Sequence, residues 1–287
     1  MTDHTMKKNP ISIPHSIWPA DDIKRLEREA ADTLGLTLFE LMLRAGEAVF
    51  DVARESRPYA RRWLVLCGHG NNGGDGYVVA RLAKAAGILV TLVALESDKP
   101  LPEEAAQARE AWLNAGGVIH SPAIAWPENI DLIIDALLGI GLTQAPREPL
   151  SELIERANAH PAPVVSIDIP SGLLAQTGAT PGAVIRAERT VTFIVLKPGL
   201  LTGKARDVTG RLHFNSLGLD DWLTGQDAPI QRFDASQLAH WLSPRRATSH
   251  KGDHGRLVVI GGEHGTAGAI RLAGEAALRA GAGLVRV

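Results

Sequence analysis

Cysteine is almost missing from this chain of 287 residues, and so are long apolar runs and any excess of one charge. Cys67 is the only cysteine, so an intrachain disulfide is impossible and nothing points to an oxidising compartment. The longest apolar stretch, Ile130–Leu142, is interrupted by two aspartates and is too short to span a bilayer. The sequence therefore predicts neither a disulfide-stapled secreted protein nor a membrane protein.

The charges are nearly balanced, with 30 lysine and arginine residues against 32 aspartate and glutamate residues. A near-neutral chain gives no general electrostatic reason to bind nucleic acid or an anionic membrane. Residues Met1–Ser16 hold no continuous apolar stretch that could form the core of a signal peptide. We therefore expect a cytoplasmic protein whose partner is neither nucleic acid nor a membrane.

What the chain does contain is an alternation of strand-like and helix-like segments. Two amphipathic helices are expected first, over residues 21–34 and from residue 37 or 38 onward. Strands are then expected at 63–67, 88–95, 130–137, 164–169, 190–196 and 211–215, with helices at 77–86, 102–114 and 150–159. Strands that are apolar on both faces and alternate with helices indicate a parallel sheet covered on both sides. The predicted fold class is therefore α/β: a doubly wound, mostly parallel sheet with helices on both faces, which is a Rossmann-like three-layer sandwich.

A polar stretch rich in proline and glycine, around residues 224–229, predicts a domain boundary. We expect one domain over residues 1–225 and a second unit over residues 230–287. The second unit should contain a strand at 256–260, a helix at 267–279 and the start of another strand at 284–287. Because a natural domain seldom ends where a sheet strand begins, we expect this unit to be an N-terminal fragment with poorly covered apolar residues in both strands.

A glycine-rich segment follows the first strand of the expected sheet. Gly68, Gly70 and Gly73 satisfy the pattern G-x-G-x-x-G, and Glu96 ends the next strand, where a ribose-binding acid would stand. A nicotinamide-dependent dehydrogenase is one interpretation, and a purely structural tight turn is another. The segment continues as Asn71-Asn72-Gly73-Gly74-Asp75-Gly76, which places two amides and a carboxylate in this loop. Asp75 has a structural interpretation as a helix cap, whereas the asparagines are less needed for folding.

Three strand ends carry polar groups that folding does not obviously demand: Asn71-Asn72, Asp135 and Asp168. Ligands of an open parallel sheet bind outside the carboxyl ends of its strands, so these groups should share one edge. A carboxylate that ends a buried strand is costly unless it is paired, hydrogen-bonded or bound to a cation. Either aspartate alone could therefore be a helix cap or half of an ion pair, but the whole set favours a ligand site.

The residues also suggest how this edge would work. Asn72, Asp135 and Ser171 offer oxygen ligands without imidazole or thiolate, which suits an alkali or alkaline-earth cation rather than zinc. If Asp135 is bound to a cation, Asp168 remains available for proton transfer. A free aspartate is ionised at neutral pH and is ready to act as a base, whereas acting as an acid would require burial.

Taken in order, these motifs resemble those of the NAD(P)H-hydrate epimerases. The resemblance covers about residues 10 to 225 and is carried by Leu41-Met42 with Ala45-Gly46, Gly70 to Gly76, Asp135-Ala136-Leu137-Leu138-Gly139 and Asp168-Ile169-Pro170-Ser171-Gly172. It implies an isomerase of metabolite repair. Reduced nicotinamide cofactors hydrate at the dihydropyridine ring, and the epimerase interconverts the R and S hydrates so that an S-specific dehydratase can restore NADH or NADPH.

The resemblance also implies roles for individual residues. Asp168 should be the catalytic residue and lie at the reacting carbon. Asn72, Asp135 and Ser171 should bind a potassium ion. The hydrated dinucleotide should contact Asn71, Asn72, Gly73, Gly74, Asp75, Gly139, Ile140, Gly141, Leu142, Thr143, Gln144, Ala145 and Asp168.

The second unit carries a resemblance of its own. His250-Lys251-Gly252-Asp253-His254-Gly255 and the glycines from Gly261-Gly262 to Gly283 resemble the start of the ADP-dependent NAD(P)H-hydrate dehydratase, a lyase with a ribokinase-like fold. That resemblance implies a multifunctional enzyme in which ADP or ATP serves only the dehydratase domain. Because the unit is expected to be incomplete, we expect this chain to epimerise and not to dehydrate.

Two rival functions stay open beside the epimerase. One is a Rossmann-type NAD(P)-dependent oxidoreductase that uses the same glycine-rich loop. The other is a non-catalytic nucleotide-binding scaffold, although a scaffold would have no physical need for Asp168 together with both asparagines. Association into a homo-oligomer is also open. His69 is interpreted as a loop-packing residue, and Lys197 as a phosphate contact or a solvated lysine at a strand end.

Overall fold

The computed structural model describes residues 13–95, 97–242, 244–265 and 267–287, so Glu96 and the first twelve residues lie outside the described residues. The chain forms two compact units, Met1–Arg232 and Phe233–Val287. Within the described residues, no helix has the length and apolar character needed to cross a lipid bilayer.

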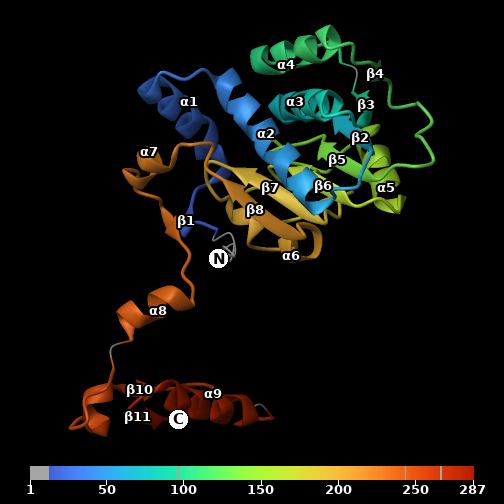
Figure 1. The fold of residues 1–287 in the computed structure, drawn as a ribbon. Coiled ribbons are helices and arrows are strands. Elements are labelled where there is room, and N and C mark those ends of the chain that lie inside the picture. The colour runs from blue at the N-terminus through green and yellow to red at the C-terminus, as the bar shows by residue number, and fades with distance from the viewer. Residues whose placement is uncertain (1–12, 96, 243, 266) are drawn as a thin grey trace, which may run out of the picture. The chain divides into compact units, whose positions relative to one another are not determined.

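The first unit is built on a seven-stranded sheet in which every neighbouring pair of strands is parallel (Figure 1). In sheet order the strands are β4 (Ile119–His120), β3 (Leu89–Ala94), β2 (Arg62–Cys67), β5 (Leu132–Ala136), β6 (Val164–Ile167), β7 (Arg189–Phe193) and β8 (Arg211–Asn215). The helices are α1 (Ile23–Leu34), α2 (Leu38–Ser56), α3 (Asn71–Ala85), α4 (Glu103–Asn114), α5 (Leu150–Ala159), α6 (Ala205–Val208) and α7 (Asp220–Thr224). The predicted α/β fold with a mostly parallel sheet is confirmed.

Alternate side chains of the central strands enter different cores. Val65 and Cys67 of β2 pack in the core that contains buried residues of α1, α2, α3 and α4. Leu64 and Leu66 of the same strand pack in a second core with buried residues of α5. Because successive side chains of a strand point to opposite faces, these two cores lie on the two faces of the sheet.

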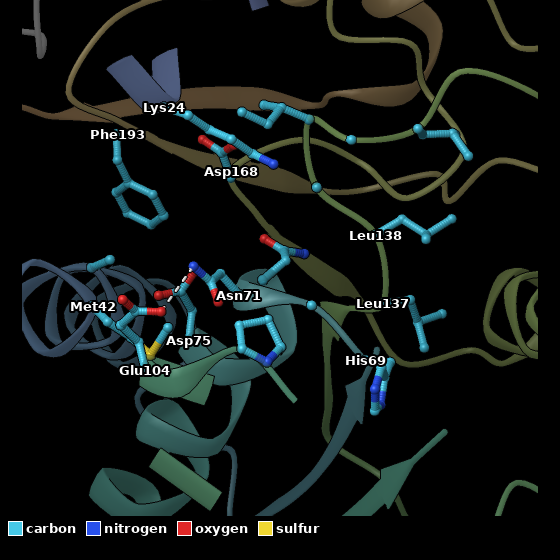
Figure 2. A pocket seen from close by; sticks show the side chains of 18 of the residues that line it. Lys24, Met42, His69, Asn71, Asp75, Glu104, Leu137, Leu138, Asp168 and Phe193 are labelled. Carbon is cyan, nitrogen blue, oxygen red and sulfur yellow. Dashed lines mark hydrogen bonds between the residues drawn. The ribbon is translucent and has the colours of Figure 1, made fainter. Parts of the chain in front are cut away.

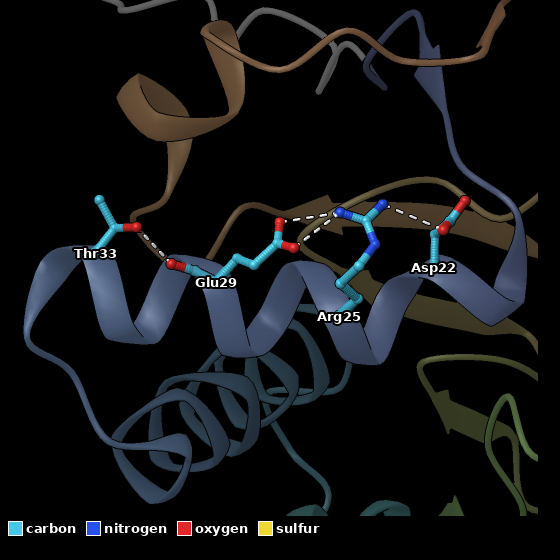
Figure 3. A network of polar contacts seen from close by, with 4 residues as sticks. All are labelled: Asp22, Arg25, Glu29 and Thr33. Carbon is cyan, nitrogen blue, oxygen red and sulfur yellow. Dashed lines mark hydrogen bonds and ion pairs between the residues drawn. The ribbon is translucent and has the colours of Figure 1, made fainter.

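The two N-terminal helices are each fixed by local polar pairs. On α1, Arg25 bonds Asp22 at 3.2 Å and Glu29 at 3.0 Å (Figure 3), which are the spacings that stabilise a helix surface. At the start of α2, the Thr37 hydroxyl accepts a bond from the Glu40 N–H, and the Glu40 carboxylate accepts one from the Thr37 N–H. This capping box explains why α2 begins where the sequence predicts.

The start of α3 differs from the prediction. The helix begins at Asn71, not near Tyr77, so the glycine-rich segment forms its first turns instead of a loop. A Cβ on Gly73 would overlap the backbone carbonyl of Gly68, and one on Gly76 would lie 2.8 Å from the Cys67 sulfur. The glycines therefore let the helix pack closely on the sheet. The helix-cap interpretation of Asp75 is wrong, because the N-cap position is Gly70 and no side chain caps this end.

Some short elements were not predicted, since two residues carry too little periodicity to be recognised. β1 (Ser16–Ile17) pairs antiparallel with β9 (Ile230–Gln231), and Ile17 also bridges to Leu196. The two 3-10 helices of this unit, Ala20–Asp22 and Pro198–Leu200, were likewise not expected.

The second unit contains a strand–helix–strand motif, as the sequence predicts. β10 (Arg256–Val258) and β11 (Leu284–Arg286) are parallel neighbours and are joined through α9 (Ala267–Ala280). The other elements are α8 (Ala235–Trp241) and a 3-10 helix at Lys251–His254. Apolar side chains are exposed here, as expected: Val258 is 59% exposed and Ile260 is 92% exposed.

Candidate active site

A cavity of about 900 Å³ lies at the carboxyl ends of the central strands. The chain runs from β2 through α3 to β3 on one side, whereas β5 lies on the other side of β2, so the strand order reverses between β2 and β5. Residues that follow both strands line the cavity (Figure 2). A switch point of this kind is where open α/β sheets bind ligands, and the volume suits a nucleotide-sized one.

The structure brings most of the predicted site residues together in this cavity. Asn71, Asn72, Asp75, Asp168 and the whole segment Gly139–Ala145 line it. Gly73 and Gly74 do not, because both are buried in packing contacts, and a Cβ on Gly74 would lie 2.5 Å from the Met42 side chain. Asp135 and Ser171 are also fully buried and do not line the cavity.

Asp168 forms a buried ion pair with Lys197. The Lys197 side chain is 1% exposed, and its ammonium donates to Asp168 Oδ1, to Thr192 Oγ1 at 2.9 Å and to the Phe193 carbonyl at 3.0 Å. Thr192 donates to the same oxygen of Asp168 at 3.2 Å. Both interpretations of Lys197 made from the sequence are wrong, because the ammonium is neither solvated nor free for a phosphate.

The backbone at the ends of β6 and β7 is in the left-handed region. Asp168 has φ of 62°, and Ile194, which follows β7, has the same value. Aspartate tolerates the left-handed region, but a β-branched isoleucine rarely adopts it. Hydrogen bonds hold both residues there, from the Asp168 N–H to the Val191 carbonyl at 2.7 Å and from the Ile194 N–H to the Asn215 carbonyl at 2.9 Å. Such strain persists where the surrounding structure enforces it, and it clusters at functional sites.

Asp135 is held by four hydrogen bonds from neutral groups. Its Oδ1 accepts from the Ser171 hydroxyl at 2.5 Å and the Leu137 N–H at 3.3 Å, and its Oδ2 accepts from the Ser166 hydroxyl at 2.7 Å and the Ser171 N–H at 2.9 Å. Burial raises the pKa of Asp135, and these hydrogen bonds oppose that shift. Asp135 is therefore neither a helix cap nor half of an ion pair.

Two side chains at the cavity have a buried nitrogen without a hydrogen-bond partner in the described part of the chain. They are Asn72, through Nδ2, and His69, through Nε2. Asn72 lies against Gly139, whose Cβ, if present, would be 3.3 Å from the Asn72 Cβ. Buried polar groups are normally paired, so these two nitrogens are candidates for contact with a ligand or water.

Two further carboxyl groups face the cavity with raised pKa values. Burial, and then the charge of Asp168, raise the pKa of Glu27 on α1 to about 7. Burial, and then the charges of Asp168 and Glu27, raise the pKa of Asp75 well above its usual range. Groups perturbed in this way and gathered in a cleft mark a functional site.

The pairing of Lys197 with Asp168 and the place of Glu27 at the cavity were not predicted from the sequence. The only local signal for Lys197 is a single charge between the apolar Val195-Leu196 and Pro198-Gly199. Glu27 carries no local signal, because it lies on an N-terminal helix whose position depends on tertiary packing.

Fold and site together define a Rossmann-like α/β domain with a ligand cavity at its topological switch point. Residues 38–199 match the family model described as YjeF-related protein N-terminus. The chain belongs to that family.

Named relatives share this sequence over nearly all of its length. The chain is 78% identical over 287 residues to the bifunctional NAD(P)H-hydrate repair enzyme Nnr of Escherichia coli, covering 100% of this chain and 56% of the relative. It is 46% identical to the bifunctional NAD(P)H-hydrate repair enzyme of Leishmania braziliensis, covering 94% of this chain and 50% of the relative. The chain thus spans about half the length of these curated relatives.

A solved structure shows the same fold. The crystal structure of yeast ynu0, YNL200c, superposes with a TM-score of 0.60 at 22% identity, covering 77% of this chain and 98% of the yeast chain.

Proposed function

We propose that the first unit of this chain interconverts the R and S hydrates of NADH and NADPH. The observation that carries the proposal is the cavity at the switch point, where Asp168, paired with Lys197, faces the asparagines of α3 and the segment Gly139–Ala145. The names of the relatives, which are NAD(P)H-hydrate repair enzymes, support the same substrate. Residues 1–225 would form the epimerase domain.

The start of α3 supports the binding of a dinucleotide. No side chain caps this end of the helix, and Gly70, Asn71 and Asn72 line the cavity. Free N–H groups and the helix dipole at such an end favour a phosphate group. The diphosphate of the hydrate would lie here, with the segment Gly139–Ala145 and Asp75 along the rest of the ligand. Gly73 would keep α3 close to the end of β2, and Gly74 would keep it close to α2 and α4.

Asp168 would be the catalytic residue. Lys197 and Thr192 both donate to its Oδ1, and no described residue donates to its Oδ2. The ion pair thus fixes the carboxylate and leaves one oxygen for a proton of the substrate or of a water. General acid–base catalysis by one positioned group contributes about 10²–10⁴-fold.

A potassium ion would be held by Asn72, Asp135 and Ser171. Asp135 is a fully buried carboxylate whose hydrogen-bond donors are all neutral, so a cation would balance its charge. The described residues contain no group of three or more histidine, cysteine, aspartate or glutamate side chains that could hold a metal ion. One carboxylate with neutral oxygens fits a weakly held monovalent ion.

The cation requirement has a direct test. Exchanging potassium for a bulky organic cation at constant ionic strength should weaken binding of the hydrate, and Asn72→Ala should reproduce the loss. Unchanged binding after rigorous exchange would leave Asp135 with a structural role only.

The second unit would be the start of a ribokinase-like dehydratase domain. Its strand–helix–strand motif and its exposed apolar strands agree with that assignment. ADP or ATP would serve only that domain.

The epimerase proposal is tested with one purified hydrate. Adding the protein to the S hydrate should produce the R hydrate on chiral chromatography, with the total amount of hydrate unchanged. A dehydrogenase would instead oxidise NAD(P)H in the presence of a carbonyl substrate. A binding scaffold would do neither.

A further inference from the structure

Resting on the epimerase function proposed above, we infer that Asp75 is a second catalytic residue, the acid that faces Asp168 across the cavity and protonates the departing hydroxyl. The two carboxyl groups then act on opposite faces of one carbon.

The chemistry of the substrate calls for two groups. Hydration of an enamine-like ring bond places the hydroxyl on the carbon beside the nitrogen, because the nitrogen lone pair stabilises positive charge there. Inverting that carbon through loss and return of water requires an acid on the face from which the hydroxyl leaves. It also requires a base on the face to which water adds.

The geometry supplies two carboxyl groups from different elements. Asp75 lies in the second turn of α3, and Asp168 follows β6; Figure 2 shows the two reaching the pocket from separate directions. The glycine beside Asp75 fixes its position, since a Cβ on Gly76 would lie 2.6 Å from the Ala136 Cβ. Gly76 thus holds the backbone of Asp75 against the sheet, and the ion pair with Lys197 holds the Asp168 side chain.

The hydrogen bonds of the two groups differ in the way an acid and a base require. Asp168 is ion-paired with Lys197. The Asp75 side chain has no hydrogen-bond partner within the described ranges of the chain, although it lines the cavity. A carboxyl group without a cation or donor beside it is more stable when protonated.

The charges around Asp75 favour the same state. Burial raises the pKa of Asp75, the charges of Asp168 and Glu27 raise it further, and only Lys197 opposes them. The other ionisable groups that line the cavity are Lys24 and Arg28 on α1, His69 before α3, Glu104 on α4 and Arg147 before α5. These charges favour the protonated form of Asp75 beside an ion-paired Asp168.

The step balances. The Asp75 carboxyl proton goes to the hydroxyl, the carbon–oxygen bond breaks, and a water leaves while the nitrogen lone pair forms a carbon–nitrogen double bond. A second water adds to the opposite face of that carbon and gives one proton to Asp168. Asp75 ends ionised and Asp168 protonated, which is the state that runs the reverse epimerisation, and exchange with solvent resets both groups.

Asp75→Asn tests the role of the acid. It keeps the shape of the side chain and removes the transferable proton, so kcat should fall about 10²–10⁴-fold while KM changes little. The parent rate should decline at alkaline pH as Asp75 ionises, and the variant should lose this decline. Glu103→Gln is the matched control, because Glu103 is an exposed carboxylate next to the cavity-lining Glu104 and does not itself line the cavity. A kcat of Asp75→Asn within about threefold of the parent, or an alkaline decline that persists, would overturn the inference.

Two further readouts separate this inference from the proposed function. In water labelled with oxygen-18, epimerised product should carry the label beyond an enzyme-free control, and epimerisation without label would overturn the step. Carboxyl carbon NMR of labelled aspartate should show a high-titrating signal that is present in the parent and absent from Asp75→Asn, in addition to any signal from Asp135. If the parent protein does not epimerise either hydrate, the proposed function fails. If the titration instead shows that Asp75 is ionised at neutral pH, only the acid role of Asp75 is overturned.

Discussion

Replacing Lys197 by methionine removes the ammonium of the buried ion pair and keeps the length of the side chain. Asp168 then keeps only the hydrogen bond from the Thr192 hydroxyl. The Phe193 carbonyl loses the bond from the ammonium but still accepts one from the Val195 N–H at 2.6 Å. Removing one member of a buried ion pair costs about 3–5 kcal/mol. Because the Asp168 side chain is 15% exposed on its cavity side, we expect the lower end, about 3 kcal/mol. For a unit of this size that loss lowers the melting temperature by about 6–12 °C.

The double variant Lys197→Met/Asp168→Asn removes both charges of the ion pair. It leaves no unpaired charge, so it should be more stable than Lys197→Met alone by about 1–2 kcal/mol. Lys24→Met is the control, since Lys24 is an exposed lysine that lines the same cavity, and its effect should stay within about 0.5 kcal/mol. Thermal melting followed by circular dichroism measures all three. A Lys197→Met protein that melts with the parent, or a double variant no more stable than the single one, would refute a stabilising ion pair.

Three other predictions follow from the site. Asp168→Asn should lower kcat about 10²–10⁴-fold. It should also lower the melting temperature because Lys197 loses its partner, so the rates of parent and variant are compared well below the variant's melting temperature. The pKa of Glu27 is raised from 4.5 to about 7, so between these pH values the folded state holds a proton that the unfolded state has lost. The stability of the parent should therefore fall as pH rises through this range, and Glu27→Gln should make the accompanying fall in melting temperature smaller. Gly73→Ala should cost roughly 3 kcal/mol through its overlap with Gly68, whereas Gly141→Ala, with nothing within 4 Å of its Cβ, should leave stability unchanged and weaken hydrate binding.

The sheet and part of the cavity lining could be predicted from the sequence because both depend on local patterns. Apolar runs such as Leu132–Ala136 identify buried strands. The rule that parallel strands carry ligands at their carboxyl ends then brings Asn71 and Asp168 to one edge, whereas the segment Gly139–Ala145 was expected only from the family resemblance. No contact between distant residues has to be known for either step.

The electrostatics of the site could not be predicted in the same way. Lys197 and Asp168 are 29 residues apart, and nothing in the sequence says that they pair. Glu27 reaches the cavity only because α1 packs through Leu26 and Ala30 into the core. The early start of α3 was missed because glycine disfavours a helix by about 1 kcal/mol, and tertiary packing overrides that preference.

The most direct test of the account is a coupled assay. A mixture of R and S hydrates is treated with an S-specific dehydratase, so that only the S form is consumed, and this protein is then added. We predict that the R hydrate disappears faster than in its absence, and that Asp168→Asn removes most of the acceleration. An R hydrate that persists at the spontaneous rate, with folded protein present, would contradict the assignment of this cavity as an epimerase site.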